Sequence, residues 1–64
     1  MNNTSAAVQE AREIHHNLQD DLAYQYSVEN NDEINMQMVL RAYGYSYSYD
    51  DASLQIKEAL AITC

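Results

Sequence analysis

The single glycine of this chain, Gly44, is its strongest structural signal, because it follows a segment with helical periodicity. Apolar residues recur every four positions before it, which places them on one face of a helix. Arg41 lies in the last turn, where its charge favours the negative end of the helix dipole. A glycine just beyond that turn is typical of a left-handed helix stop. The predicted stripe consists of Ile34, Met38 and Ala42, with Val39 beside it.

Capping patterns predict where the helices begin. Asn30 followed by Glu33 resembles a capping box at the start of the helix that Gly44 ends. Thr4 or Ser5 can cap an earlier helix, because their hydroxyls accept from free N–H groups of a first turn. The apolar positions of that earlier helix are Ala7, Ala11, Ile14 and Leu18.

The pair Asp20-Asp21 has two interpretations, and both stay open from the sequence. It either interrupts the first helix or starts a second short one. The run from Glu29 to Asp32 is a break, because Asn and Asp side chains compete with the helix for backbone hydrogen bonds. The second short helix would carry Leu22, Ala23 and Tyr26.

A last helix is predicted after Ser48, which forms a capping-box pattern with Asp51. Proline is absent, so nothing in the chain interrupts helix propensity. The sequence therefore predicts an all-α fold with three or four short helices. Residues 1–60 form the helical region, and residues 61–64 form a flexible tail. The apolar side of the last helix consists of Ala52, Ile56, Ala59 and Leu60.

The length limits how stable this fold can be. A domain of about 60 residues buries only about 60% of the surface of its unfolded chain. The chain has one cysteine, so it cannot form an intrachain disulfide, and it has no Cys/His cluster for a structural zinc. We therefore expect a small domain, or one that is partly disordered until it binds a partner.

The formal net charge of −7 excludes two classes of partner. Binding to DNA or RNA without sequence preference needs Lys and Arg side chains that neutralise phosphates, and anionic membranes need them as well. The acidic residues instead favour solubility or a basic groove on a partner protein. The N-terminal segment has no secretory signal, and no stretch is apolar enough to span a membrane, so we expect a cytoplasmic protein.

No residue pattern predicts catalysis. His15 and His16 are adjacent and would diverge by about 100° on a helix, so they do not share one metal ion. The acidic pairs at positions 20–21 and 50–51 are explained by helix capping. The chain has no glycine-rich phosphate loop and no nucleophile–base spacing. We therefore expect no enzyme activity and no cofactor of its own.

Tyrosines gather around the glycine, at positions 43, 45, 47 and 49. Two of them pack onto the helices in place of the missing Phe and Trp, or the group forms a docking surface, as tyrosines often do at interfaces. The alternation from Tyr45 to Tyr49 fits a short strand, which could add to a partner's sheet edge. It also fits an extended linker or a low-complexity accident.

Cys64, the last residue and the one thiol, is the candidate site of chemistry. Its thiolate and its terminal carboxylate can together chelate one metal ion in a partner's active site. An incidental or introduced cysteine is the competing interpretation.

Two stretches resemble Nif11-type leaders of ribosomally made, post-translationally modified peptides. They are LQDDLAYQY, at Leu18–Tyr26, and VLRAYGYSYSYDDASL, at Val39–Leu54, and together they cover part of the chain. Such leaders have no catalytic residues, and they recruit enzymes that modify residues near the C-terminus. The resemblance therefore implies modifying enzymes as partners. The implied contact residues are Leu18, Leu22, Tyr26, Tyr43, Tyr45, Tyr47 and Tyr49.

The chain lacks the Gly-Gly and the longer core peptide of most such precursors, which directs attention to Cys64. It is similar to the scaffold peptides of pearlin pathways, typified by 3-thiaglutamate biosynthesis. In that family an iron-dependent enzyme acts on a terminal cysteine while a partner subunit holds the peptide. This resemblance implies that Cys64 is the modified residue and that the iron belongs to the partner. The alternative is a small acidic phage-type inhibitor that blocks a basic groove.

Overall fold

The computed structural model describes residues 5–45 and 48–63, and within these ranges the protein is built from four helices and has no strand. The all-α prediction is confirmed. The described part forms a compact helical body with a common core. The helices are α1 (Ala6–Leu18), α2 (Leu22–Glu29), α3 (Glu33–Ala42) and α4 (Tyr49–Thr63).

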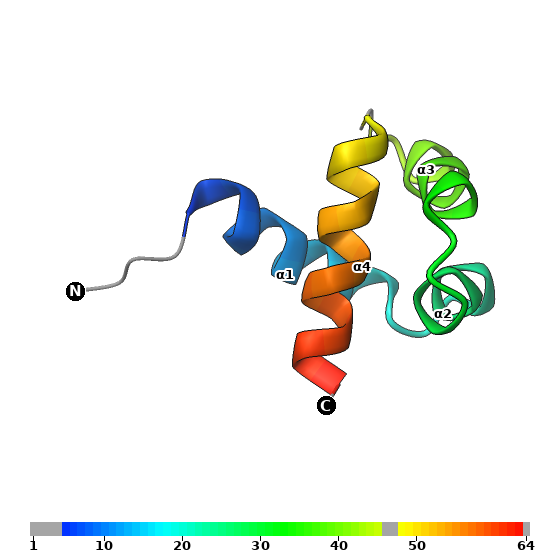
Figure 1. The fold of residues 1–64 in the computed structure, drawn as a ribbon, viewed down its shortest axis with the longest axis horizontal. Helices are drawn as coiled ribbons and strands as arrows, with labels where there is room; N and C mark the ends of the chain where they lie inside the picture. The colour runs from blue at the N-terminus through cyan, green and yellow to red at the C-terminus, as the bar shows by residue number, and fades with distance from the viewer. Residues whose placement is uncertain (1–4, 46–47, 64) are drawn as a thin grey trace.

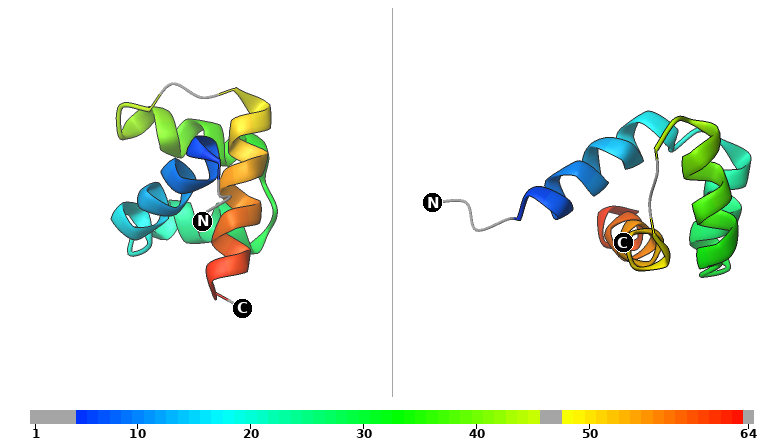
Figure 2. Two further views of the ribbon diagram at one scale, coloured as in Figure 1. Left: turned by 90° about the vertical axis from the view of Figure 1, so that its left-hand side faces the viewer. Right: turned by 90° about the horizontal axis from the view of Figure 1, so that it is seen from above.

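Helix α4 is the central element of the fold and packs against the three others. Figure 1 shows α1 on one side of α4, and α2 and α3 on the other. The view from above in Figure 2 shows α4 nearly end-on, inside the angle that α1 forms with the α2–α3 pair. Helices α2 and α3 also pack against each other as a helical hairpin, joined by a short turn.

Three of the predicted helix starts are confirmed by side-chain hydrogen bonds. Ser5 Oγ accepts from the Val8 N–H at 3.2 Å and caps α1. At α4, Asp51 N–H donates to Ser48 Oγ at 3.3 Å, and Ser48 N–H donates to the Asp51 carboxylate at 3.2 Å. Asp21 caps α2, which settles the open question at positions 20–21 in favour of a second helix.

The predicted capping box at Asn30 is wrong. The N-cap of α3 is Asp32, whose carboxylate accepts from the Asn35 N–H at 3.0 Å. Asn30 instead ends α2, and its N–H donates to the Tyr26 carbonyl. The reason lies between them, where Asn31 has a positive φ of 52°. Asparagine tolerates this left-handed conformation, so the chain reverses there before α3 begins.

The end of α3 matches the prediction from Gly44. This glycine has a φ of 91°, and its N–H donates to the Arg41 carbonyl at 3.0 Å. The Tyr45 N–H reaches back to the Leu40 carbonyl at 2.9 Å. This pair of bonds is a Schellman motif. Tyr45 then packs against the core that contains Leu40, so the turn directs the chain from α3 towards α4.

The core takes a different face of α3 from the stripe of Ile34, Met38 and Ala42. Met36, Val39 and Leu40 are buried, whereas Ile34 and Met38 of the predicted stripe are 59% and 61% exposed. Arg41 explains the difference, because it would lie about 60° from the centre of that stripe and so beside the core. The buried cluster consists of Ile14, Leu18, Tyr24, Val28, Met36, Val39, Leu40, Ala52, Ile56 and Ala59.

The predicted apolar side of α4 is largely confirmed. Ala52, Ile56 and Ala59 are buried, and Leu60 at the edge is 41% exposed. The helix continues to Thr63, so residues 61–63 extend α4 where a flexible tail was expected. Thr63 Oγ1 donates to the Ala59 carbonyl at 3.0 Å within this last turn.

A buried hydrogen-bond network joins three helices around Gln55 of α4. Its Nε2 donates to the Ala11 carbonyl of α1 at 2.7 Å and to the Tyr24 hydroxyl of α2 at 3.0 Å. The Tyr24 hydroxyl lies 2.9 Å from His15 Nδ1, back on α1. Because Gln55 supplies a donor to Tyr24, the single hydroxyl proton of Tyr24 is free to go to His15 Nδ1. The imidazole proton is then on Nε2.

Two methionines on α3 give a matched test of which face packs inward. Met36→Ala should lower the free energy of unfolding by about 2–5 kcal/mol, because it leaves a cavity at a fully buried site. Met38→Ala removes the same atoms at an exposed site and should change that free energy by less than about 0.5 kcal/mol. Urea unfolding followed by circular dichroism measures both. Equal losses in the two variants would contradict this packing.

Gly44→Val should lower the free energy of unfolding by about 1–2 kcal/mol, because a β-branched residue is strained at positive φ. A Cβ at this position would meet no atom within 4 Å, so the cost arises from the backbone and not from a clash. Gly44→Asn is the control and should cost less, since asparagine tolerates left-handed backbone. Thermal unfolding of the three proteins gives the order. If Val is tolerated as well as Asn, the glycine is not needed for the turn.

Candidate functional site

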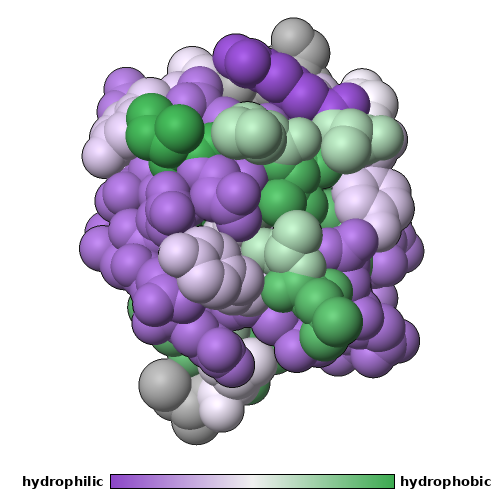
Figure 3. Space-filling view, turned by 90° about the vertical axis from the view of Figure 1, so that its right-hand side faces the viewer, coloured by the Kyte–Doolittle hydropathy of each residue, from purple (hydrophilic) through white to green (hydrophobic). Residues whose placement is uncertain are grey.

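Large hydrophobic side chains gather on the outer surface of the α2–α3 hairpin. Figure 3 shows this side of the molecule, where hydrophobic surface runs across both helices between hydrophilic regions. Leu22 is 79% exposed, and Ile34 and Met38 are more than half exposed. The α2–α3 face, as we call it, consists of Leu22, Ala23 and Tyr26 on α2 and Ile34, Met38 and Ala42 on α3.

A shallow groove of about 240 Å³ lies within this face, between the two helices. Ala23 and Ala42 leave it open because their side chains are small, and Met38 and Val39 supply its apolar lining. Asn35 lies at its edge. Below it, the helices are joined by a polar contact, in which Asn35 Nδ2 donates to Ser27 Oγ at 2.7 Å. Ser27 Oγ donates in turn to the Ala23 carbonyl at 3.0 Å.

Asp21 and Tyr43 close one end of the groove. The Tyr43 hydroxyl donates to Asp21 Oδ2, while Asp21 Oδ1 accepts from the Tyr24 N–H at 3.0 Å. The bond from Tyr43 is the main reason that the pKa of Asp21 is lowered, and it also raises the pKa of Tyr43. Asp21 therefore keeps its negative charge at the end of the groove under mildly acidic conditions.

The hairpin carries much of the negative charge of the protein. Between residues 20 and 43 the sequence has five acidic residues and one basic residue, Arg41. Asp20 and Asp21 precede α2, at the same end as the C-terminus of α3. The other end has Glu29, at the last position of α2, and Asp32 and Glu33 at the start of α3. The hairpin thus has carboxylates at both ends, and one of them, Asp21, lines the groove.

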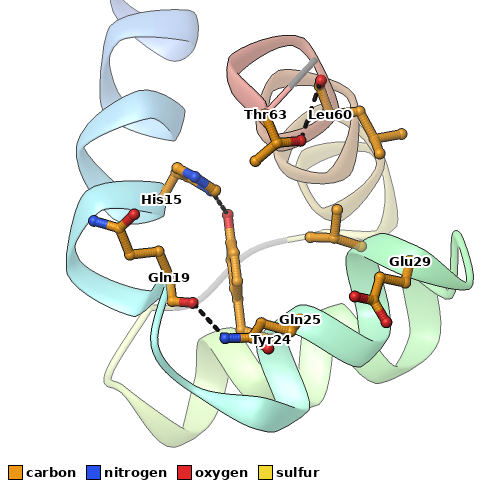
Figure 4. A pocket seen from close by; sticks show the side chains of 8 residues that line it. His15, Gln19, Tyr24, Gln25, Glu29, Leu60 and Thr63 are labelled. Atoms are coloured by element: carbon orange, nitrogen blue, oxygen red, sulfur yellow. Dashed lines mark hydrogen bonds between the residues drawn. The ribbon is translucent and has the colours of Figure 1, made fainter.

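A second pocket, of about 300 Å³, lies where α1, α2 and the end of α4 meet. Figure 4 shows the Tyr24 ring standing inside it, with its hydroxyl directed towards His15. Leu60 and Thr63 border it from α4, and Glu29 lies at its α2 side. At the opposite edge, Gln25 Nε2 donates to the Gln19 carbonyl at 2.8 Å and holds α2 against the end of α1.

His15 is buried beside this pocket, and its surroundings favour the neutral imidazole. Burial is the main cause of the lowered pKa of His15, and the positive charge of His16 adds to it. The network has the same preference, because protonation of Nδ1 would remove the acceptor that the neutral ring offers to the Tyr24 hydroxyl proton. His16 itself is exposed, so the two rings have separate environments, as their adjacent positions predict.

Some of the residues proposed as partner contacts are exposed in the structure, and one of them is buried. Leu18 is 3% exposed and belongs to the core, so its side chain is not presented to a partner here. Leu22 and Tyr26 lie exposed on the α2–α3 face. Tyr43 is half exposed and bonds to Asp21 at the end of the groove.

The remaining residues proposed as partner contacts differ in how far they are exposed. Tyr45 packs partly against the core. Tyr49 begins α4 and is half exposed, so the segment does not continue as a strand through this position. The charge of the nearby Glu33 is the main cause of the raised pKa of Tyr49. Tyr47 and Cys64 lie outside the described residues.

Sequence reasoning placed Ile34, Met38 and Ala42 on one apolar stripe of the helix but did not identify that stripe as part of an exposed face. A signal was present in the sequence. Helix α3 has apolar residues on two sides, since Met36 and Leu40 form a second stripe. A helix at the surface of a small domain buries one stripe, so an additional one remains exposed.

Among the described residues, no group of three or more His, Cys, Asp and Glu side chains is placed to hold a metal ion. In the same part of the chain, no helix is both long and apolar enough to cross a bilayer. Comparison with known protein families, characterised proteins and solved structures finds no match to this chain.

The stability of the protein should fall as the pH is lowered from about 7.5 to about 5.5. The folded pKa of His15 lies below its ordinary value of 6.5, so the unfolded chain binds the proton first. The contribution of neutral His15 is complete above about pH 6.5 and is lost as the pH falls below it. Urea unfolding at a series of pH values measures this.

Two histidine substitutions identify the group responsible for that pH dependence. His15→Gln removes the titrating ring from the network and should flatten the profile in this range. His16→Gln, at the exposed neighbouring position, should leave most of the slope in place. A profile that is unchanged in His15→Gln would show that His15 is not the group that titrates.

Proposed function

We propose that this protein is a recognition peptide whose helical body is held by a modifying enzyme and whose Cys64 is the residue modified. The α2–α3 face is the observation that carries the first half of this proposal. Leu22, Ile34 and Met38 are large apolar side chains left in water by a domain that has few others to bury. Clustered apolar side chains with a polar surround are typical of protein interaction surfaces.

The second half of the proposal, the chemistry at Cys64, is supported by the resemblance to scaffold peptides. A thiolate is a strong ligand for a transition metal, and iron is the metal that the resemblance implies. The metal belongs to the partner enzyme in this proposal. The helical body supplies affinity and orientation, while the thiol supplies the reacting group, so the two functions are carried by separate residues.

Substitution of Leu22 and of Cys64 should therefore affect different steps. Leu22→Asp places a charge in the apolar face and should lower the fraction of modified protein about tenfold at limiting enzyme, as expected for loss of one interface hot spot. Gln9→Asp adds the same charge at an exposed site on α1 and should have little effect. Cys64→Ser should abolish modification and leave binding of the body unchanged.

Intact mass spectrometry of the protein recovered from its native cells measures this directly. Modification at Cys64 should appear as a mass change that is located to this residue by fragmentation and is missing in Cys64→Ser. A chain that forms a complex through Leu22 but carries no change at Cys64 would instead support the inhibitor of a basic groove. If Cys64 is modified to the same extent in Leu22→Asp as in the unsubstituted protein, the α2–α3 face has no role in recognition.

A further inference from the structure

We propose that the groove of the α2–α3 face takes one large apolar side chain of a partner protein segment that carries Lys or Arg residues beside it. This inference rests on the proposed function, because it specifies the partner of the same face. Its basis is the arrangement of small apolar residues beside the Asp21 carboxylate, on a hairpin with five acidic residues and one basic residue.

The groove has the size and chemistry for an apolar anchor. Its volume of about 240 Å³ accommodates one large aliphatic or aromatic side chain, and it lies beside Ala23 and Ala42, where no side chain of the described residues fills it. The Met38 thioether forms one wall, and methionine adapts its shape to different apolar groups. Asn35, which lines the groove, joins α3 to α2 through its bond to Ser27.

The charges around the groove select the flanking residues of the partner. Asp21 is fixed at one end by its bonds from Tyr43 and from the Tyr24 N–H. Asp32 caps α3 at the other end of the hairpin, does not line the groove, and adds to the negative charge of the hairpin. A basic residue beside the apolar anchor would meet Asp21, whereas an acidic partner would be repelled.

The same charges argue against a second copy of this chain as the occupant. If the α2–α3 faces of two copies came together, two acidic hairpins would face each other. Each hairpin has five acidic residues and one basic residue, Arg41. Like charges in such proximity are unfavourable. A partner protein segment with a basic surround therefore fits the groove better.

A synthetic peptide tests this occupant. The probe is a blocked 16-residue amphipathic helix with leucines on one face and lysines elsewhere, compared with the same peptide carrying glutamates in place of the lysines. The full chain, labelled with ¹⁵N, is titrated with each, and amide shifts report where binding occurs. The lysine peptide should shift the amides of Ala23, Met38 and Ala42 most, and should bind more weakly at high salt. The glutamate peptide should leave them unchanged.

The matched variants separate groove binding from attraction to any acidic surface. Ala42→Glu fills the groove and also adds a negative charge, so purely electrostatic attachment would become stronger, whereas blocked insertion should weaken binding about tenfold. Ala7→Glu adds the same charge at an exposed site on α1 and should not weaken binding. Met38→Ala removes a groove wall and should weaken binding even if Ala42→Glu is poorly folded.

Several results would overturn the proposal. These are unchanged or tighter binding by Ala42→Glu, shifts spread over α1 and α4, or equal binding of the glutamate peptide. A dimer in sedimentation that shifts the same amides without peptide would assign the groove to a second copy. Modification of Cys64 that persists when the groove is blocked would overturn this inference and leave the proposed function in place. Groove binding without any modification of Cys64 would overturn the proposed function and leave this inference in place.

Discussion

The fold depends on the hydrogen bonds that Gln55 makes inside the protein. Its amide satisfies a carbonyl of α1 and the hydroxyl of Tyr24 on α2, and that hydroxyl also contacts His15. An unpaired polar group in the core would be costly, so any sliding or rotation of one helix loses stability at several points. In a chain this short the apolar core alone specifies helix positions weakly, and the network supplies the missing specificity.

This central constraint determines what is left at the surface. With α4 held between α1 and the hairpin, the hairpin has one side for the core and one side for solvent. Met36 and Leu40 fill the core side, so Ile34 and Met38 remain outside. The same packing that buries Tyr24 therefore also leaves the apolar α2–α3 face exposed.

The features of the fold that were predicted most accurately are those that depend on local signals in the sequence. Ser5, Ser48 and Gly44 act where their patterns indicated, because capping and left-handed turns depend on a few neighbouring residues. The cap of α3 was misassigned because Asn30 and Asp32 are equally good candidates until Asn31 reverses the chain. Which of the two apolar stripes of α3 is buried could not be predicted from the sequence, since it depends on packing between helices that are distant in sequence. For the candidate site, Leu22, Tyr26 and Tyr43 were found on the α2–α3 face or at its end, while Leu18 belongs to the core.

The carboxylates at the two ends of the hairpin include the groups that start its two helices. Asp21 caps α2 and Asp32 caps α3, and in an antiparallel hairpin these starts lie at opposite ends. Helix starts favour negative charge because of the helix dipole and the free N–H groups. The requirement for folding therefore places a negative charge at each end of the α2–α3 hairpin, and the one on Asp21 lines the groove. A partner that inserted an apolar side chain beside Asp21 would meet that charge, so the proposed preference for basic flanks follows from the way the hairpin folds.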